Sequence, residues 1–208
     1  EFCRTYLGPV CRVIRDGPLP FTIYCGLFGL AFPCYELFRL NGDSRARHVC
    51  IAIADAILHL ASRDRHGLVL HDDGEPGRKD VTFTIPDTLY FVVRALMIGS
   101  LLDPQRGPVY RQQALQQVRT STDIFLDRKL GLARTILTPA GLGRTYWCRA
   151  SGWLMYALTS VLRHLSSDDP QFGPITRDLR TLADGVAASV GPAGGLRALA
   201  NDPTTPEE

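Results

Sequence analysis

The sequence predicts an all-α protein built from three helical hairpins of an α/α toroid. Apolar helical stretches alternate with amphipathic ones, turn signals separate them, and a Gly-Leu pair recurs every 64 residues, at 67–68, 131–132 and 195–196. Stacked hairpins have this pattern, because one helix of each pair packs on both sides while its partner faces water.

The three apolar stretches begin at nearly the same phase of the repeat. They are residues 20–40, "DTLYFVVRALMIGSLL" from Asp87 and "SGWLMYALTSVLRHL" from Ser151. We expect these helices, the first starting near residue 21, to lie inside the ring, since few of their positions are polar. The most apolar segment, 20–35, is too short to span a bilayer, so no membrane contact is predicted.

A more polar helix is expected after each apolar one, over 44–62, 108–128 and 173–190. These helices should lie outside and be less buried than their partners. The signals "NGD", "DPQRGP" and "SSDDP" mark the turns. A fourth apolar helix would begin at roughly residue 215 by this period. Residues 1–208 are therefore expected to form a single, incomplete toroid domain, whose uncovered apolar edges favour self-association.

Charge and cysteine usage exclude several classes of protein. The 23 basic and 21 acidic residues are interspersed, with no basic run of the kind that binds nucleic acid. No cysteine-histidine spacing indicates zinc. Cys25 and Cys34 would lie on opposite faces of one helix, about 13 Å apart, and so cannot form a disulfide. We interpret the six cysteines as mostly reduced, buried thiols, which favours a cytoplasmic location.

Both tryptophans of the chain, Trp147 and Trp153, fall in "TYWCRASGWLMYAL", with Arg149 between them. Asp87 and Ser151 occupy the same phase of the repeat, so the helices that they begin should open onto one mouth of the ring. Helix N-termini and the Arg149 fork suit an anion, and indole faces suit sugar rings. The pattern predicts a pocket for an acidic sugar.

Simpler interpretations of these residues are open. Asp87 could be a plain N-cap. Trp153 could fill the core, with Arg149 extending over it toward solvent. His71-Asp72-Asp73 resembles a metal cluster, but we interpret it as a solvated loop. The shared phase of Asp87 and the tryptophan cluster favours the pocket.

The same residues resemble a known family. "TYWCRASGWLMYALTSVLRHLSSDDP" is similar to the W-x-R-x-N-G-W signature of the unsaturated rhamnogalacturonyl hydrolases, glycoside hydrolase family 105, which is related to the family 88 unsaturated glucuronyl hydrolases. "IPDTLYFVVRAL" and "GGLRALANDPTTPEE" resemble two further segments of that family, in the same order. The resemblance covers about residues 21–208 and implies an (α/α)6 barrel, of which three hairpins are present.

The resemblance also implies a reaction. Members of the family remove the unsaturated uronate from the non-reducing end of oligosaccharides made by lyases. Asp87 matches the catalytic aspartate, which protonates C4 of the C4=C5 double bond and then assists water addition at C5. Trp147, Arg149, Ser151 and Trp153 match the substrate-binding residues. No metal or cofactor is implied, and a single carboxylate serves both steps, unlike in ordinary glycosidases.

Three positions depart from the family pattern. Ser151 replaces the usual asparagine, Thr135 stands where many members carry a pocket histidine, and "FTIYCGLFGLAF" lacks an acid to match a second pocket aspartate. These departures favour the main alternative, a non-catalytic carbohydrate-binding or scaffold protein on the same toroid. A lanthionine-cyclase-like toroid would instead need zinc bound through Cys148, for which no partner motif is present.

Overall fold

The computed structural model of the protein describes residues 28–71, 82–192 and 194–200. Helices dominate this part of the chain, and the predicted all-α class is confirmed. The helices are α2 (Ala31–Asn41), α3 (Ser44–His59), α4 (Pro86–Leu102), α5 (Gly107–Phe125), α6 (Cys148–Leu162) and α7 (Phe172–Ala188). The expected helix start near residue 21, and Cys25, lie outside the described residues.

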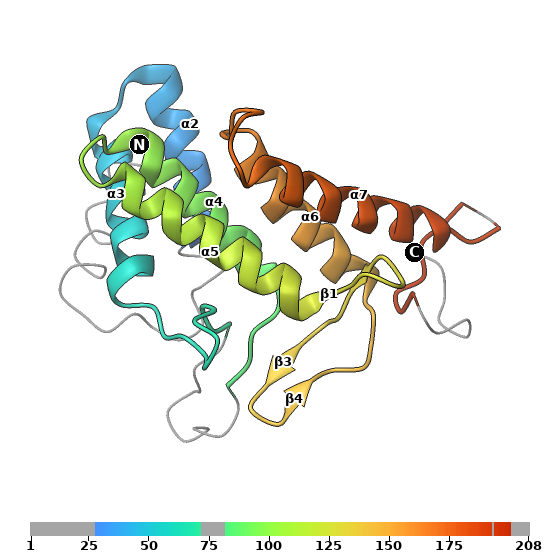
Figure 1. The fold of residues 1–208 in the computed structure, drawn as a ribbon. Helices are drawn as coiled ribbons and strands as arrows, with labels where there is room; N and C mark the ends of the chain where they lie inside the picture. Colours follow the sequence, from blue (N-terminus) through green and yellow to red (C-terminus); the bar gives the residue numbers. More distant parts are fainter. Residues whose placement is uncertain (1–27, 72–81, 193, 201–208) are drawn as a thin grey trace.

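Four very short strands stand between α5 and α6. They form two antiparallel pairs, β1 (Leu126–Asp127) with β2 (Leu132–Ala133) and β3 (Leu137–Thr138) with β4 (Gly141–Leu142). Figure 1 shows that the β3–β4 hairpin and the described residues that follow α3 extend to the same side of the helices. Long loops therefore gather at one end of the molecule, where the N-terminus of α4 also lies.

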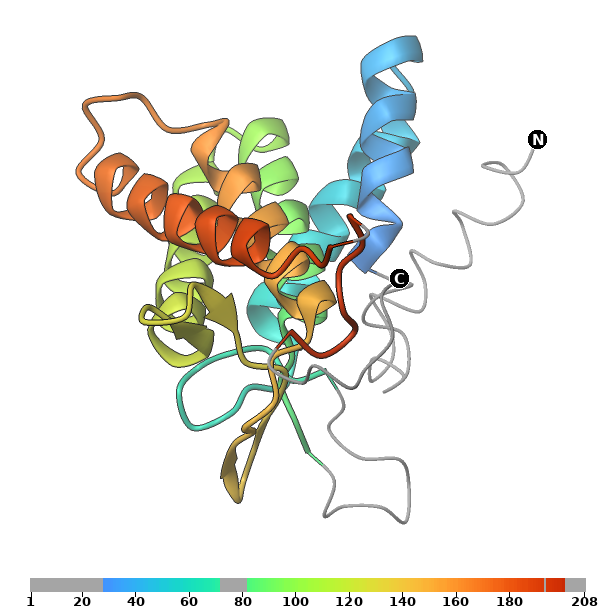
Figure 2. The ribbon, with the colours of Figure 1, turned by 90° about the vertical axis from the view of Figure 1, so that its right-hand side faces the viewer.

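Helix α4 is the centre of the packing. It contacts α2, α3, α5 and α6, and twelve of its 17 residues are buried. In Figure 1, α4 and α5 run side by side, and α6 and α7 form a second pair; Figure 2 shows α7 on the outer side of α6. The near-continuous apolar sequence of α4 explains its position, because a helix that is apolar all round must be covered on every side.

In two of the three hairpins, the apolar helix is more buried than its amphipathic partner, as expected. Eight of 19 residues are buried in α5, against twelve of 17 in α4, and three of 17 in α7, against six of 15 in α6. The expectation was wrong for the first hairpin, where α3 buries seven residues and α2 only two. The reason is position: α3 packs between α2 and α4, whereas α2 lies at the edge of the described part.

The 64-residue repeat corresponds to a turn that follows each amphipathic helix. The backbone takes left-handed φ angles of 81° at Gly67, 68° at Gly131 and 87° at Gly194, one residue before the third predicted position. Glycine adopts such angles without steric cost. An antiparallel pairing closes each turn: Arg63 with Val69, Leu126 with Ala133, and Val190 with Leu196.

The described cysteines are Cys34, Cys50 and Cys148, and all three are reduced thiols. Cys34 and Cys50 are buried, as predicted, while Cys148 is half-buried. Burial, reinforced by the neighbouring Cys34, raises the pKa of Cys50 to about 12, so this thiol stays protonated. Across the described ranges, no helix is both long and apolar enough to cross a membrane.

A close backbone approach fixes α7 against the β1–β2 turn. A Cβ atom at Gly185 would lie 2.1 Å from the backbone oxygen of Gly131. We therefore expect Gly185→Ala to lower the free energy of unfolding by about 1–3 kcal/mol, the usual cost of overpacking, although alanine is normally the better helix former. Denaturant titration measures this change. The matched control is Gly152→Ala in α6, where an added Cβ meets nothing within 4 Å; equal effects of the two changes would contradict the prediction.

Candidate functional site

Asp87 lies in the first turn of α4, directly after Pro86, the first residue of the helix. Proline is favoured at this position because its missing N–H would have no helical partner. The N-cap residue is Ile85, so the interpretation of Asp87 as a plain N-cap is wrong. The carboxyl group is free for another role.

The Asp87 carboxyl group is largely withdrawn from water. The residue is 9% exposed, and its Oδ2 is buried without a hydrogen-bond partner in the part of the chain that the structure describes. Burial raises the pKa of Asp87 above its ordinary value, and the charges of Arg149 and His71 and the Trp153 indole only partly offset this rise. The raised pKa enlarges the protonated fraction near neutral pH, as a general acid requires.

Arg149 connects the α6 end of the site to Asp87. Its Nε lies 3.7 Å from Asp87 Oδ1, and its guanidinium carbon lies 3.5 Å from the centre of the Trp147 ring. The Arg149 side chain nevertheless remains 59% exposed. Arg149 is thus held by a cation–π contact while its remaining N–H groups face solvent and can receive an anion.

Trp153 packs beside Asp87 within an aromatic cluster. Its ring stacks on Tyr90 at 5.2 Å and lies 5.6 Å from Phe91 and 6.0 Å from Tyr156. The indole Nε1 is buried and has no hydrogen-bond partner among the described residues. The same indole is one of the groups that lower the pKa of Asp87, so this donor and the Asp87 carboxyl group lie next to each other in one site.

The backbone around Trp147 is held by two neighbouring segments. The Trp147 N–H donates to Thr135 Oγ1 at 3.2 Å, and Trp147 pairs with Leu199 in an antiparallel bridge. The preceding Tyr146 donates its hydroxyl to Asp127 Oδ2 at 2.6 Å. Thr135 therefore supports the backbone at the start of α6.

Ser151 differs from the other candidates because it is fully buried. Its Oγ accepts a hydrogen bond of 2.9 Å from the backbone N–H of Ala133 in β2. A substrate at the surface would not reach this hydroxyl. In this structure Ser151 joins α6 to the β1–β2 turn, which is a supporting role rather than the predicted substrate contact.

His71 is a residue of this site that the sequence reasoning missed. Its Nδ1 lies 2.5 Å from Thr88 Oγ1, in the first turn of α4, and its ring packs 5.1 Å from that of Phe83. His71 is therefore not part of a solvated loop, whereas Asp72 and Asp73 lie outside the described residues. The repeat held the missed signal: His71 and Thr135 each stand four residues after a repeat glycine, Gly67 or Gly131.

Metal ligands do not cluster here. Within residues 28–71, 82–192 and 194–200, the structure contains no group of three or more histidine, cysteine, aspartate or glutamate side chains arranged to hold a metal ion. What the site does bring together is one buried carboxyl group, one exposed guanidinium and two indole rings. That combination can bind an anionic sugar and transfer a proton.

The chain is similar to a known family in sequence and to solved structures in fold. Residues 27–208 match the model of glycosyl hydrolase family 88. The fold is similar to a possible member of glycoside hydrolase family 105 from Klebsiella pneumoniae, with a TM-score of 0.76 and 19% identity over 99% of this chain and 54% of that one. No curated protein matches the chain.

Two further solved structures share the fold. The unsaturated glucuronyl hydrolase from Streptococcus agalactiae has a TM-score of 0.72 and 15% identity, over 99% of this chain and 53% of that one. A structure named as UGL with dGlcA-Glc-Rha-Glc has a TM-score of 0.69 and 19% identity, over 98% and 54%. The chain thus spans about half the length of these proteins.

The raised pKa of Asp87 predicts a pH-dependent effect on stability. Because the folded-state pKa lies above the ordinary value of 3.8, the ionised carboxyl group costs stability at neutral pH, and this cost disappears below pH 3.8. We expect Asp87→Asn to raise the Tm at pH 7, with the gain shrinking as the pH falls through the folded-state pKa. Thermal melts from pH 3 to 8 measure it, and a lower Tm for the variant at pH 7 would overturn the assignment.

Proposed function

Because the chain belongs to glycosyl hydrolase family 88, we propose that it is part of a glycosidase that removes an unsaturated uronate from the non-reducing end of oligosaccharides. The observation that carries this proposal is the Asp87 carboxyl group, buried beside Arg149 and Trp153 with one oxygen lacking a partner in the described structure. Relatives of the same fold named as unsaturated glucuronyl hydrolase and as UGL with dGlcA-Glc-Rha-Glc support the substrate class.

Arg149 and the two tryptophans would bind the uronate. The exposed N–H groups of Arg149 match the planar geometry of a sugar carboxylate, and a charge-assisted pair of this kind is stronger than a neutral hydrogen bond. Trp147 holds the guanidinium from one side. Trp153 would form a wall of the pocket beside Asp87, whose pKa its indole lowers.

Asp87 would perform both proton transfers. Its protonated carboxyl group donates to C4 of the C4=C5 double bond, and the positive charge that develops at C5 is shared with the ring oxygen. The resulting carboxylate then accepts a proton from the water that adds to C5. The C5 hemiketal opens to a ketone, and the hemiacetal left at C1 releases the next sugar. The carboxyl group returns to its starting protonation state, so the cycle closes without a second acid.

The first test replaces Asp87 in the full-length protein. We expect Asp87→Asn to abolish turnover while largely sparing substrate binding, because the amide keeps the shape of the side chain but cannot transfer a proton. The assay follows the loss of alkene absorbance of a lyase-generated unsaturated disaccharide, with binding measured separately by calorimetry. Full activity of the variant would exclude Asp87 as the catalytic group. Binding without turnover in the wild type would instead favour a carbohydrate-binding protein.

The second test addresses Arg149. We expect Arg149→Ala to weaken substrate binding by about 1.5–3 kcal/mol, the value of a hydrogen bond to a charged group. The same change should move the alkaline limb of the pH–rate profile to higher pH, because the Arg149 charge lowers the pKa of Asp87. The matched control is Arg119→Ala on the exposed side of α5, which should change neither quantity. An unshifted alkaline limb would show that Arg149 does not act on Asp87.

A further inference from the structure

Tyr146 and Trp147 are neighbours in an extended segment that leads into α6. Trp147 has extended backbone angles, with φ at −85° and ψ at 123°, and it pairs with Leu199 in an antiparallel bridge. In an extended backbone, successive side chains point to opposite sides. A contact that fixes the Tyr146 side chain therefore also fixes the direction of the Trp147 ring, whose centre lies 3.5 Å from the guanidinium carbon of Arg149.

The Tyr146 side chain is held by two charged residues of the β1–β2 region. The residue is only 6% exposed, and its hydroxyl donates to Asp127 Oδ2 at 2.6 Å. The guanidinium carbon of Arg134 lies 5.0 Å from the centre of the Tyr146 ring, and its Nη2 donates to the same Asp127 oxygen at 3.3 Å. Both the ring and the hydroxyl of Tyr146 are thus fixed.

Asp127 is suited to this role because its carboxylate is charged and its own position is fixed. Its Oδ1 accepts hydrogen bonds from the backbone N–H groups of Lys129 and Leu130, at 3.1 and 3.3 Å. The hydrogen bond from Tyr146 is the largest cause that lowers the pKa of Asp127 below its ordinary value, so the carboxylate stays ionised at neutral pH. A hydrogen bond to an ionised acceptor is stronger than one between neutral groups.

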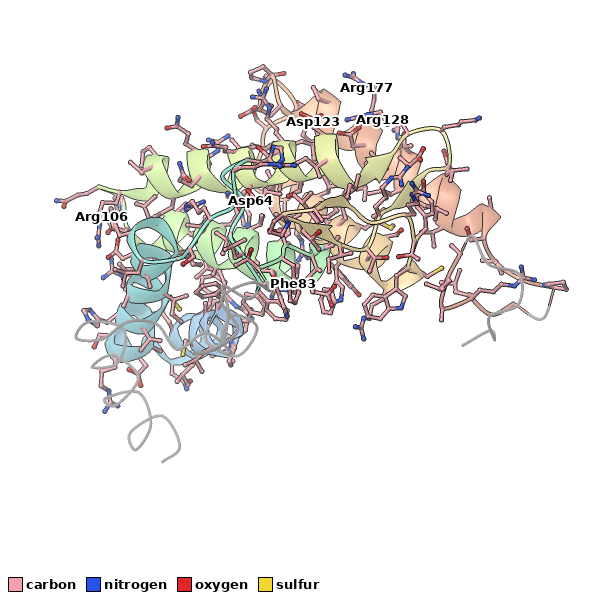
Figure 3. All side chains as sticks on the ribbon, turned by 90° about the horizontal axis from the view of Figure 1, so that it is seen from below. Asp64, Phe83, Arg106, Asp123, Arg128 and Arg177 are labelled. Atoms are coloured by element: carbon pink, nitrogen blue, oxygen red, sulfur yellow. The ribbon has the colours of Figure 1, made fainter. Side chains whose placement is uncertain are left out.

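The turn that carries Asp127 is itself fixed against α7. Arg128 Nη2 lies 3.3 Å from Asp178 Oδ1 in α7, and β2 also contacts that helix. Figure 3 labels Arg128 at the end of α5 near α7, and Arg106 at the opposite end of α5. Asp127 therefore transmits the position of the helical frame, through one side-chain hydrogen bond, to the start of α6.

We propose that Asp127 is a positioning residue for uronate binding, which acts through the Tyr146 hydroxyl to orient Trp147 and so to hold the Arg149 guanidinium beside Asp87. This role rests on the proposed function, because a sugar carboxylate gives the position of the guanidinium its purpose. Loss of the hydrogen bond should move the guanidinium without removing its charge.

The first measurement needs no substrate. The full-length protein is labelled with 5-fluorotryptophan, and the fluorine resonance that disappears in Trp147→Phe is assigned to Trp147. We expect Tyr146→Phe to shift or broaden this resonance, because the indole ring and the guanidinium over it lose their fixed orientation. Asp127→Asn keeps one oxygen for the N–H groups of the turn but removes the charged acceptor, and it should have the same effect.

The second measurement is turnover of a lyase-generated unsaturated disaccharide. We expect Tyr146→Phe to raise KM about fivefold to tenfold, as for a weakened contact to a charged group, with kcat nearly unchanged because the contact is made before and during the reaction. The alkaline limb of the kcat/KM profile should move to higher pH, since the Arg149 charge lowers the pKa of Asp87. The effects of Tyr146→Phe and Asp127→Asn should be less than additive when combined.

Tyr110→Phe is the matched control. Its hydroxyl donates to Asp55 Oδ1 at 2.5 Å, and Asp55 is also bonded to Arg106, so this variant loses the same kind of hydrogen bond at the other end of α5. It should lower the Tm without changing the Trp147 resonance, the KM or the pH profile. Thermal melts confirm that each variant folds.

The two proposals fail in different ways. If the wild type is active but Tyr146→Phe and Asp127→Asn leave the Trp147 resonance, the KM and the alkaline limb unchanged, the positioning role is overturned while the proposed function stands. Equal changes in Tyr110→Phe would likewise overturn it, because they would indicate a general loss of stability. If the wild type neither binds nor converts the disaccharide, the proposed function fails, and the role of Asp127 in uronate binding fails with it.

Discussion

Asp87 stands at the first turn of a helix that its neighbours enclose on nearly every side, and its carboxyl group has therefore lost most of its contact with water. The apolar sequence that follows it draws α4 into the centre of the packing, and the helix carries its first turn with it. Desolvation then outweighs the favourable charges of Arg149 and His71 and raises the pKa of Asp87. The other features of the site, the exposed guanidinium and the buried indole N–H, can serve catalysis only beside a carboxyl group with a raised pKa.

The turns that follow the amphipathic helices place further side chains near the starts of the apolar helices. The turns after α3 and α5 are each followed by a residue that contacts the start of an apolar helix: His71 meets Thr88 in α4, and Thr135 supports the Trp147 N–H before α6. The same position therefore carries an ionisable side chain beside Asp87 in one case and a backbone support in the other. Loops on a rigid helical frame can change in this way at little cost to stability.

Sequence periodicity was sufficient to predict the helices and to bring Asp87 together with Arg149, because a fixed repeat places equivalent helix starts at the same end. It could not predict how deeply each side chain is buried. Ser151 has the same phase as Asp87, yet its hydroxyl is fully buried against β2, since burial depends on the close approach of the β1–β2 turn. It also misjudged the first hairpin, where α3 lies between two neighbours and α2 does not. His71 was missed because its partner, Thr88, is 17 residues away and no local pattern links the two.

The charge preference of the Asp87 site follows from a difference in exposure between its two charged groups. The Asp87 carboxyl group is buried, so desolvation favours its neutral form. The Arg149 guanidinium remains largely exposed and keeps its charge. The local field therefore favours an anionic sugar, although an acid stands at the centre of the site. The loops at this end of the fold set that balance, while the helices beneath hold them in place.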